Sequence, residues 1–201
     1  MVEQPTSEQP MGTGRLEAFS DGVIAIIITI MVLELQVPRG ADASTLLGQW
    51  PVFLSYALSY LVVAIYWINH HRLFHVVPRV NYAVLWSNNL LLFCLSLIPF
   101  ATAYMGENSF KPFPTAVYAA LLFACAVAFL ILRVSINDEL KNDERFAAFR
   151  VQGRRKNLIS IGLYALSVPA AYIHPGLTLV LAFVVAGLYF LPDTLLDEIA
   201  R

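Results

Sequence analysis

Charged side chains are scarce in this sequence. Asp, Glu, Lys and Arg make up 13% of its 201 residues, whereas a soluble globular domain carries about 25%. Hydrophobic residues make up 58%. So few charges leave too little polar surface for a soluble protein, which indicates a membrane protein. Helices suit a membrane because they satisfy their own backbone hydrogen bonds in lipid. The composition therefore predicts an all-α membrane protein with the lipid bilayer as a partner.

Cysteines and the motifs of enzymes are also scarce. Cys94 and Cys125 are the only cysteines, and we interpret both as small buried hydrophobic residues within predicted spans. The sequence has no nucleotide-binding loop, nucleophile elbow or metal signature. His71 and His75 are spaced i, i+4, but no Glu or Cys completes a metal-binding pattern around them. We therefore predict no enzyme, no cofactor, no metal site and no nucleic acid partner.

Hydrophobic runs of membrane-spanning length dominate what is present. A helix needs about 20 mainly apolar residues to cross a bilayer. The last two runs are short, but they flank His174-Pro175-Gly176, a natural turn between helices. We expect residues 1–14 to form a disordered cytoplasmic tail, because they are polar and rich in Pro and Gly. Residues 15–201 then form one domain with six transmembrane helices at about 16–37, 52–69, 83–104, 113–132, 158–173 and 176–191.

Positive charge gathers in alternate connecting segments. All of the 13 Lys and Arg residues except Arg39 and Lys111 fall in the first, third, fifth and seventh segments. Because positive segments stay in the cytoplasm during insertion, both termini are predicted to be cytoplasmic. The mixed-charge segment 133–157 is expected to extend the fourth span as a solvated helix, whose basic end attracts anionic lipid.

The first hydrophobic run has two adjacent faces that differ in side-chain size. At 100° per residue, a narrow apolar stripe and a small-residue edge lie side by side. The stripe by itself suits lipid as well as a pore, whereas small residues suit close contact with another helix. The stripe comprises Val23, Ile26, Ile30 and Leu33, and the edge comprises Gly22, Ala25 and Thr29.

Two acids, Glu17 and Asp21, lie on the other side of this run. An acid at the bilayer centre costs about 2.5 to 3.5 kcal/mol, so Asp21 is expected to face protein partners. Polar residues at similar depth lie at the end of the second run and the start of the third. The candidate partners are Asn69, His70, His71, Ser87, Asn88 and Asn89.

The pattern Arg15-x-x-x-Phe19-Ser20-Asp21 resembles the signature of the transmembrane protein 175 family, whose animal members are lysosomal potassium channels. The resemblance continues through "YWINHHRLF" (66–74) and "WSNNLLLFCLSLIPFATAYMG" (86–106). It implies a homotetramer in a prokaryotic plasma membrane, with the first helix lining a central pore for potassium ions. No loop resembles the Thr-Val-Gly-Tyr-Gly filter of ordinary potassium channels.

The resemblance also implies roles for residues of the first run. Ile26 becomes the main hydrophobic constriction, followed by Ile30 and Leu33, and Thr29 offers a ring of hydroxyls. A ring of isoleucines dewets, so the first helices must move apart or rotate before a hydrated ion passes. On this hypothesis, a buried network locks the first helix to its neighbours. Its members are Arg15, Phe19, Ser20, Asp21, His70 or His71, and Asn88.

Two other classes of protein remain open at this stage. A proton-coupled secondary transporter or a proton leak pathway would protonate Asp21 during transport, and a scaffold would place Ile26 against lipid. Smaller features have their own interpretations. Glu34 and Asp42 suggest an acidic mouth, and Pro99 and Pro169 are expected to kink their helices. Membrane-interface anchoring is predicted for Trp50, Trp67 and Trp86.

Overall fold

The computed structural model describes residues 12–75, 77, 80–139 and 147–190. Every regular element among them is an α-helix. The predicted disordered tail lies mainly outside the described residues, except that Thr13 and Gly14 already belong to the first helix. In chain order the helices are α1 (Thr13–Leu33), α2 (Ala43–Gly48), α3 (Trp50–Phe74), α4 (Tyr82–Ser96), α5 (Ile98–Glu107), α6 (Pro112–Glu139), α7 (Ala147–Ile173) and α8 (Pro175–Phe190).

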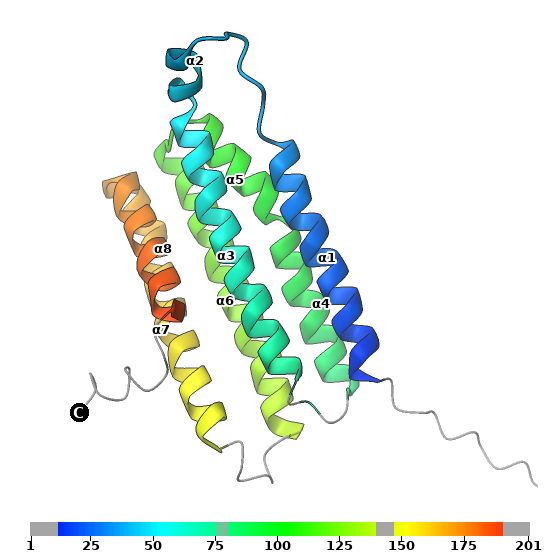
Figure 1. Cartoon of the computed structure of the whole chain (residues 1–201). Helices are drawn as coiled ribbons and strands as arrows, with labels where there is room; N and C mark the ends of the chain where they lie inside the picture. The colour runs from blue at the N-terminus through cyan, green and yellow to red at the C-terminus, as the bar shows by residue number, and fades with distance from the viewer. Residues whose placement is uncertain (1–11, 76, 78–79, 140–146, 191–201) are drawn as a thin grey trace, which may run out of the picture.

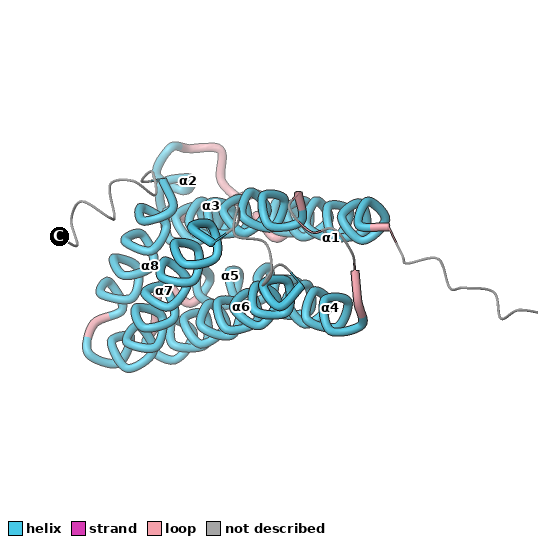
Figure 2. Tube along the Cα trace, turned by 90° about the horizontal axis from the view of Figure 1, so that it is seen from below, coloured by secondary structure: helices cyan, strands magenta, loops and turns pink. Residues whose placement is uncertain are grey.

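Four segments are long and apolar enough to cross a membrane: α1, α3, the pair α4 and α5 taken together, and α6. The shorter α8 is also apolar. Helices α7 and α8 form the hairpin predicted at His174, whose backbone N–H still bonds to Ala170 of α7 while its carbonyl accepts from Leu177 of α8. The long helices run side by side, and α1 lies at one edge, far from α7 and α8 (Figures 1 and 2).

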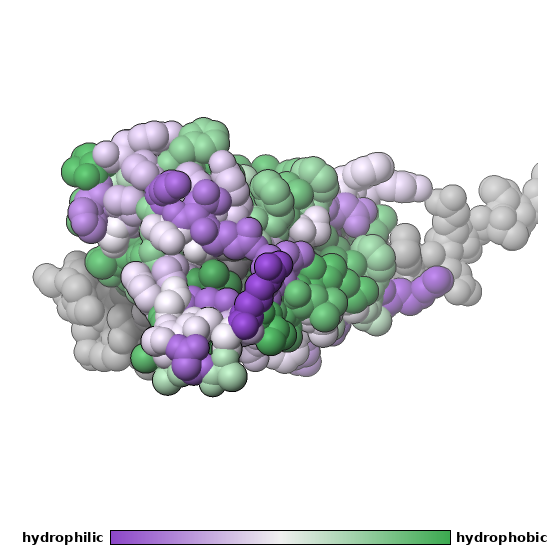
Figure 3. Space-filling view, turned by 90° about the horizontal axis from the view of Figure 1, so that it is seen from above, coloured by the Kyte–Doolittle hydropathy of each residue, from purple (hydrophilic) through white to green (hydrophobic). Residues whose placement is uncertain are grey.

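The end of the bundle that carries α2 is polar. Figure 3 looks down on this end and shows hydrophilic residues over much of it, with hydrophobic surface toward the sides. Asp42 caps α2 here, because its carboxylate accepts the Thr45 backbone N–H at 3.2 Å. The hydroxyls of Ser44 and Thr45 also donate to it, and these bonds lower the pKa of Asp42 to about 2. A bond of 3.2 Å between Gln36 Nε2 and Glu107 Oε1 joins the end of the α1 segment to α5.

The third predicted span is broken, as Pro99 predicts. Helix α4 ends at Ser96 and α5 starts at Ile98, with Pro99 in its first turn, where a missing N–H does no harm. Hydroxyl groups gather beside the break. Thr102 Oγ1 bonds to the Ile98 carbonyl and to Ser59 Oγ, both at 2.7 Å. Pro169, in contrast, lies within α7, which continues as a helix on both sides of it.

The prediction for segment 133–157 is confirmed in part: the fourth span does continue beyond residue 132 as a helix, but the expected solvation is wrong at Arg133 and Lys156. Helix α6 ends at Glu139, residues from Ala147 onward begin α7, and 140–146 lie outside the described residues. Arg133 and Lys156 are buried rather than solvated. The Arg133 guanidinium packs 5.3 Å from the centre of the Phe129 ring and lies against Gly153, where an added Cβ would come within 1.9 Å of it. The charge of Arg133 and Lys156 predicted contact with solvent, but the packing of α6 against α7 buries the apolar parts of both side chains.

Candidate pore-lining helix

Helix α1 buries one face and leaves the other uncovered within the chain. Its buried residues follow the spacing of a single helical stripe, and they pack against α3, α4 and α5. They are Leu16, Ser20, Ile24, Ile27 and Met31. In its most apolar stretch only 28% of residues are buried, against 39%, 50% and 56% for the other three candidate spans. Of those four segments, α1 is therefore the one least covered by its own chain.

Three of the four residues of the stripe predicted from periodicity lie on the uncovered face, whereas the fourth, Val23, is partly buried against the core. Ile26 is 58% exposed, Ile30 is 40% exposed and Leu33 is 81% exposed. Phe19 is also exposed, at 56%, so it takes no part in a buried network within the chain. A Cβ added to Gly22 would meet nothing within 4 Å, and Ala25 and Thr29, the other residues of the small-residue edge, are also exposed.

Thr29 belongs to the same uncovered face. Its Oγ1 donates a 2.8 Å hydrogen bond to the Ile26 carbonyl, one turn earlier in the helix. The hydroxyl proton is therefore held by the backbone, and both lone pairs of the oxygen stay available to accept. An oxygen held in this way can accept a hydrogen bond or contact a cation, and it does not need an acceptor of its own.

The buried face of α1 is joined to α3 and α4 by a chain of hydrogen bonds. Asn88 Nδ2 donates to Ser20 Oγ at 3.0 Å, and Asn88 Oδ1 lies 2.8 Å from His70 Nε2. Because the amide oxygen can only accept, Nε2 of His70 carries the proton. Ser20 in turn donates to the Leu16 carbonyl at 2.8 Å. Ser20, His70 and Asn88 are fully buried, so each bond is protected from water.

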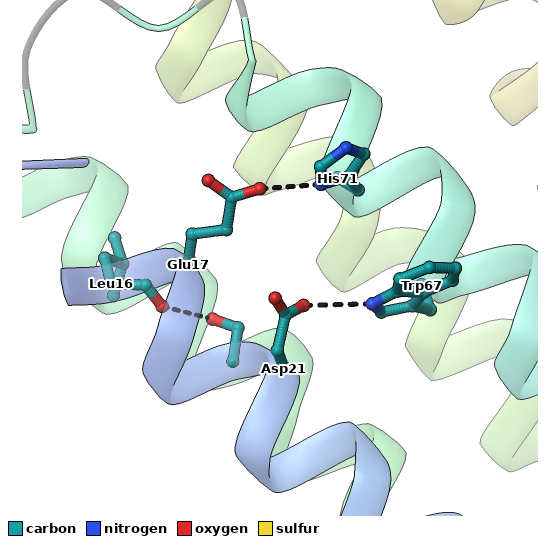
Figure 4. Close-up of polar contacts among 6 residues, drawn as sticks. Leu16, Glu17, Asp21, Trp67 and His71 are labelled. Atoms are coloured by element: carbon teal, nitrogen blue, oxygen red, sulfur yellow. Dashed lines mark hydrogen bonds and ion pairs between the residues drawn. The ribbon is translucent and has the colours of Figure 1, made fainter. Parts of the chain in front are cut away.

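Two further bonds link α1 to α3 nearer the surface (Figure 4). Asp21 Oδ1 accepts from Trp67 Nε1 at 2.9 Å, and Glu17 Oε1 lies 2.7 Å from His71 Nδ1. The acids are four residues apart on α1, and their partners are four residues apart on α3 in the reverse order. The two helices are antiparallel, so these contacts form two rungs separated by one helical turn.

The structure corrects the predicted partners of Asp21. Ser20, His70 and Asn88 are brought together as expected, but Asp21 lies outside their network and bonds to Trp67 instead. His71 pairs with Glu17, and Arg15 is exposed and makes none of these bonds within the described chain. The anchoring role predicted for Trp67 overlooked its indole N–H. Glu17 and Asp21 are spaced i, i+4, and so are Trp67 and His71, and this matching spacing could have indicated the two contacts from the sequence.

Comparisons with known proteins identify the family of this chain. The family model described as "Endosomal/lysosomal potassium channel TMEM175" matches residues 15–99. The chain is 43% identical over 189 residues to a potassium channel of Chryseobacterium sp. (strain P1-3), covering 94% of this chain and 97% of that relative. It is also similar to the crystal structure of a lysosomal potassium-selective channel TMEM175 homolog from Chamaesiphon minutus, with a TM-score of 0.77 and 32% identity, covering 88% of this chain and 95% of that one.

A more distant similarity reaches an animal protein. The chain is 31% identical over 134 residues to the human endosomal/lysosomal proton channel TMEM175, and the match covers 61% of this chain and 26% of the human protein. The chain thus spans about a quarter of that relative. With the bacterial relative matched over nearly its whole length, the resemblance noted from the Phe19-Ser20-Asp21 motif is confirmed. The chain belongs to the TMEM175 potassium channel family.

Proposed function

We propose that the protein is a potassium-permeable cation channel, a homotetramer in which α1 of each subunit lines a central pore. The observation that carries the proposal is the exposure of Ile26, Ile30 and Leu33 on α1, opposite a face that is packed and hydrogen-bonded. In a bilayer this uncovered face can lie against lipid, another subunit or a pore, and the relatives named as potassium channels favour the pore. Potassium is the ion named for the similar bacterial channels.

The membrane arrangement in this proposal has six spans. The 27 residues of α7 and the 16 residues of α8 form the fifth and sixth, in addition to the four candidate segments. An even number of spans puts both termini on one side, and the distribution of Lys and Arg favours the cytoplasm of a prokaryote. No reaction is catalysed, since the work of a channel is to lower the barrier to ion passage.

The mechanism follows from the chemistry of the α1 face. Four Ile26 side chains meeting on an axis form an apolar constriction that expels water and blocks a hydrated cation. Movement of α1 widens it, and Ile30 and Leu33 extend the same apolar lining. Thr29 oxygens replace part of the ion's hydration shell without fixed charge. In the constricted state, the Ser20–Asn88–His70 network and the two rungs to Trp67 and His71 tie the opposite face of α1 to α3 and α4.

Single-channel recording tests this proposal. Purified protein in planar bilayers under a potassium-to-sodium gradient is compared with Ile26→Ala and Ile26→Asn, which widen or wet the constriction. Ile131→Ala is the matched control, because Ile131 is an isoleucine that is also exposed, at 43%, but lies on α6. We expect larger or less selective currents from both Ile26 variants and wild-type currents from Ile131→Ala. Silence from intact oligomers of every variant would refute a conducting pore.

Proton conduction is the second candidate, and it has one specific observation in its favour. The human relative is named as a proton channel. A proton pathway predicts current that follows a pH gradient when potassium is absent on both sides. A proton-coupled carrier makes a further prediction, that Asp21→Asn abolishes transport in assembled protein. Asn still has an oxygen to accept from Trp67, so the channel proposal predicts that this variant conducts.

A further inference from the structure

Asn89 is a polar side chain on a surface of α4 that the subunit does not cover. It is exposed, and among the described residues its amide makes no hydrogen bond. Trp86 and Phe93 belong to the same exposed face, at 72% and 64% exposure. The amide lies inside the apolar segment Tyr82–Glu107, where lipid offers it no hydrogen-bond partner. A partner from another chain would satisfy it.

A carboxylate oxygen on α1 is in the same situation. Asp21 Oδ1 accepts from Trp67 Nε1 at 2.9 Å, but within the described chain Asp21 Oδ2 has no partner. The rungs lie at the surface of the subunit (Figure 4), since Trp67 is 43% exposed and the His71 side chain is 53% exposed. An acid within a span is costly unless it is bonded. The subunit thus presents an unused acceptor on α1 and an unused donor on α4.

The donor and the acceptor lie at the same depth in the membrane. Asn88 Nδ2 bonds to Ser20 Oγ at 3.0 Å. Asn89 is the next residue after the first of these and Asp21 the next after the second, and α1 and α4 run in the same direction (Figure 1). Subunits in a membrane ring are related by an axis along the membrane normal. Rotation about that axis keeps every atom at its depth, so groups at equal depth can meet between subunits.

The two groups are also presented by different layers of the subunit. Viewed along the helices, α1 and α3 form one layer and α4 and α6 the other (Figure 2). The rungs are exposed on the first layer, and Asn89 is exposed on the second. In a ring, one face of each subunit meets a different face of the next. Such an interface brings Asn89 of one subunit to Asp21 of its neighbour.

The residues on either side fit the same register. One turn toward the α1 N-terminus, Trp86 lies at the level of the exposed His71. One turn the other way, Phe93 lies at the level of Ala25, which is small and exposed. Gly22 lies beside it, where an added Cβ would meet nothing within 4 Å. Large rings on α4 therefore oppose an imidazole and a small-residue edge, which leave room for them.

We propose that neighbouring subunits are joined by a hydrogen bond from Asn89 Nδ2 of one subunit to Asp21 Oδ2 of the next, repeated around the ring. The inference rests on the proposed homotetramer and names a contact that holds its subunits together, but it does not depend on ion conduction. Asp21 then has two functions. Its Oδ1 joins α1 to α3 within the subunit, and its Oδ2 joins this pair to α4 of the neighbour.

The association of the full-length protein in detergent tests the contact, with monomer and tetramer counted by native mass spectrometry over a range of concentrations. Asn89→Leu removes the donor. With about 0.6 kcal/mol for each of four bonds, we expect the dissociation constant of the tetramer to rise roughly 60-fold. Tyr172→Leu is the matched control, because Tyr172 is 60% exposed on α7, far from α1, and it should leave association unchanged. Unchanged or stronger association of Asn89→Leu would place Asn89 against lipid and overturn the proposal.

An exchange of the two side chains separates this contact from a general loss of packing. Asn89→Asp places two carboxylates against each other and should weaken association more than Asn89→Leu does. Adding Asp21→Asn restores a donor opposite an acceptor and keeps an oxygen for Trp67, so association of the double variant should return to within about threefold of wild type. A double variant as weak as Asn89→Asp would refute the contact. Asn89 makes no bond within its own subunit, so these changes act on association and leave the unfolding of the subunit itself unaltered.

Currents from the same samples separate this inference from the proposed function. Conducting tetramers that are indifferent to the exchange would refute the contact and leave the channel standing. Tetramers that require the pair but conduct no ions would refute the channel and leave the contact standing. A wild-type protein that stays monomeric at every concentration would refute both.

Discussion

Asn88 is the residue whose removal should most clearly show what holds α1 in place. Its side chain is fully buried and bridges two helices, donating to Ser20 Oγ at 3.0 Å and accepting from His70 Nε2 at 2.8 Å. Asn88→Ala removes both bonds. It leaves the His70 N–H without an acceptor in a site that water does not reach, and no other described hydrogen bond joins Ser20 to α4.

The magnitude follows from these two bonds. A buried polar group left without its partner costs about 1 to 3 kcal/mol, while hydrogen bonds between helices in membranes average about 0.6 kcal/mol and reach about 1.7. We therefore expect Asn88→Ala to lower the free energy of unfolding by about 2 to 4 kcal/mol. For a chain of this length that corresponds to a fall in Tm of about 5 to 15 °C.

Thermal unfolding of the detergent-purified protein, followed by tryptophan fluorescence, is the measurement. Asn89→Ala is the matched control, because Asn89 is the next residue on α4 and is exposed. It should change the free energy of unfolding by less than about 0.5 kcal/mol. A double-mutant cycle with Ser20→Ala then isolates the 3.0 Å bond, and its coupling energy should be about 1 kcal/mol.

Two outcomes would refute the proposed role of the buried network in holding α1. If Asn88→Ala and Asn89→Ala unfold at the same temperature, the buried network contributes nothing to holding α1, and the proposed lock has no energetic basis. If Asn88→Ala is destabilising but the cycle with Ser20→Ala gives no coupling, the effect comes from the bond to His70 alone. In that case α3 and α4 are joined by the network, and α1 is held by its apolar face.

Three other predictions follow from the structure. Trp67→Phe removes the indole donor and should destabilise the α1–α3 pairing by about 1 kcal/mol in thermal unfolding, whereas Asp21→Asn, which keeps an acceptor, should have less than half that effect; the reverse order would contradict the rung. Ser109 has φ of 50° and is exposed, so Ser109→Gly should raise the free energy of unfolding by up to about 1 kcal/mol, and a fall in Tm would show that the position is not strained. The pKa of Asp42 is lowered to about 2, so its stabilisation of α2 should be complete above its ordinary value of 3.8 and lost as the pH falls through about 2; an NMR titration midpoint near 3.8 would show that the cap does not form.

Local sequence pattern predicted the elements well where the physics is local. Hydrophobic length located the helices, Pro99 located the break between α4 and α5, and His174-Pro175-Gly176 located the last hairpin. The end of α3 was placed too early, at residue 69, because His70 and His71 look like the polar end of a span. In the structure both residues are helical, and their side chains bond to α4 and α1, contacts that depend on which helices are neighbours.

The candidate site was predicted in part for the same reason. Periodicity grouped Ile26, Ile30 and Leu33 on one face, and the family motif singled out Asp21. Neither the periodicity nor the motif identified Trp67 as the partner of Asp21, because that contact depends on the antiparallel register of α1 and α3. Arg133 was likewise misplaced, since a glycine on another helix makes the room for its guanidinium.

By itself, the sequence determined that this is a helical membrane protein, where its apolar segments lie, which residues share a face of α1, and which family its first half resembles. These properties depend on composition and on the helical period, and both are set by residues close together in the sequence. Only the tertiary structure decided which face of α1 is covered, which donors meet Glu17 and Asp21, and that Arg133 is buried. A helix has the same period whatever lies beside it, so burial and pairing are determined only when the other helices are in place.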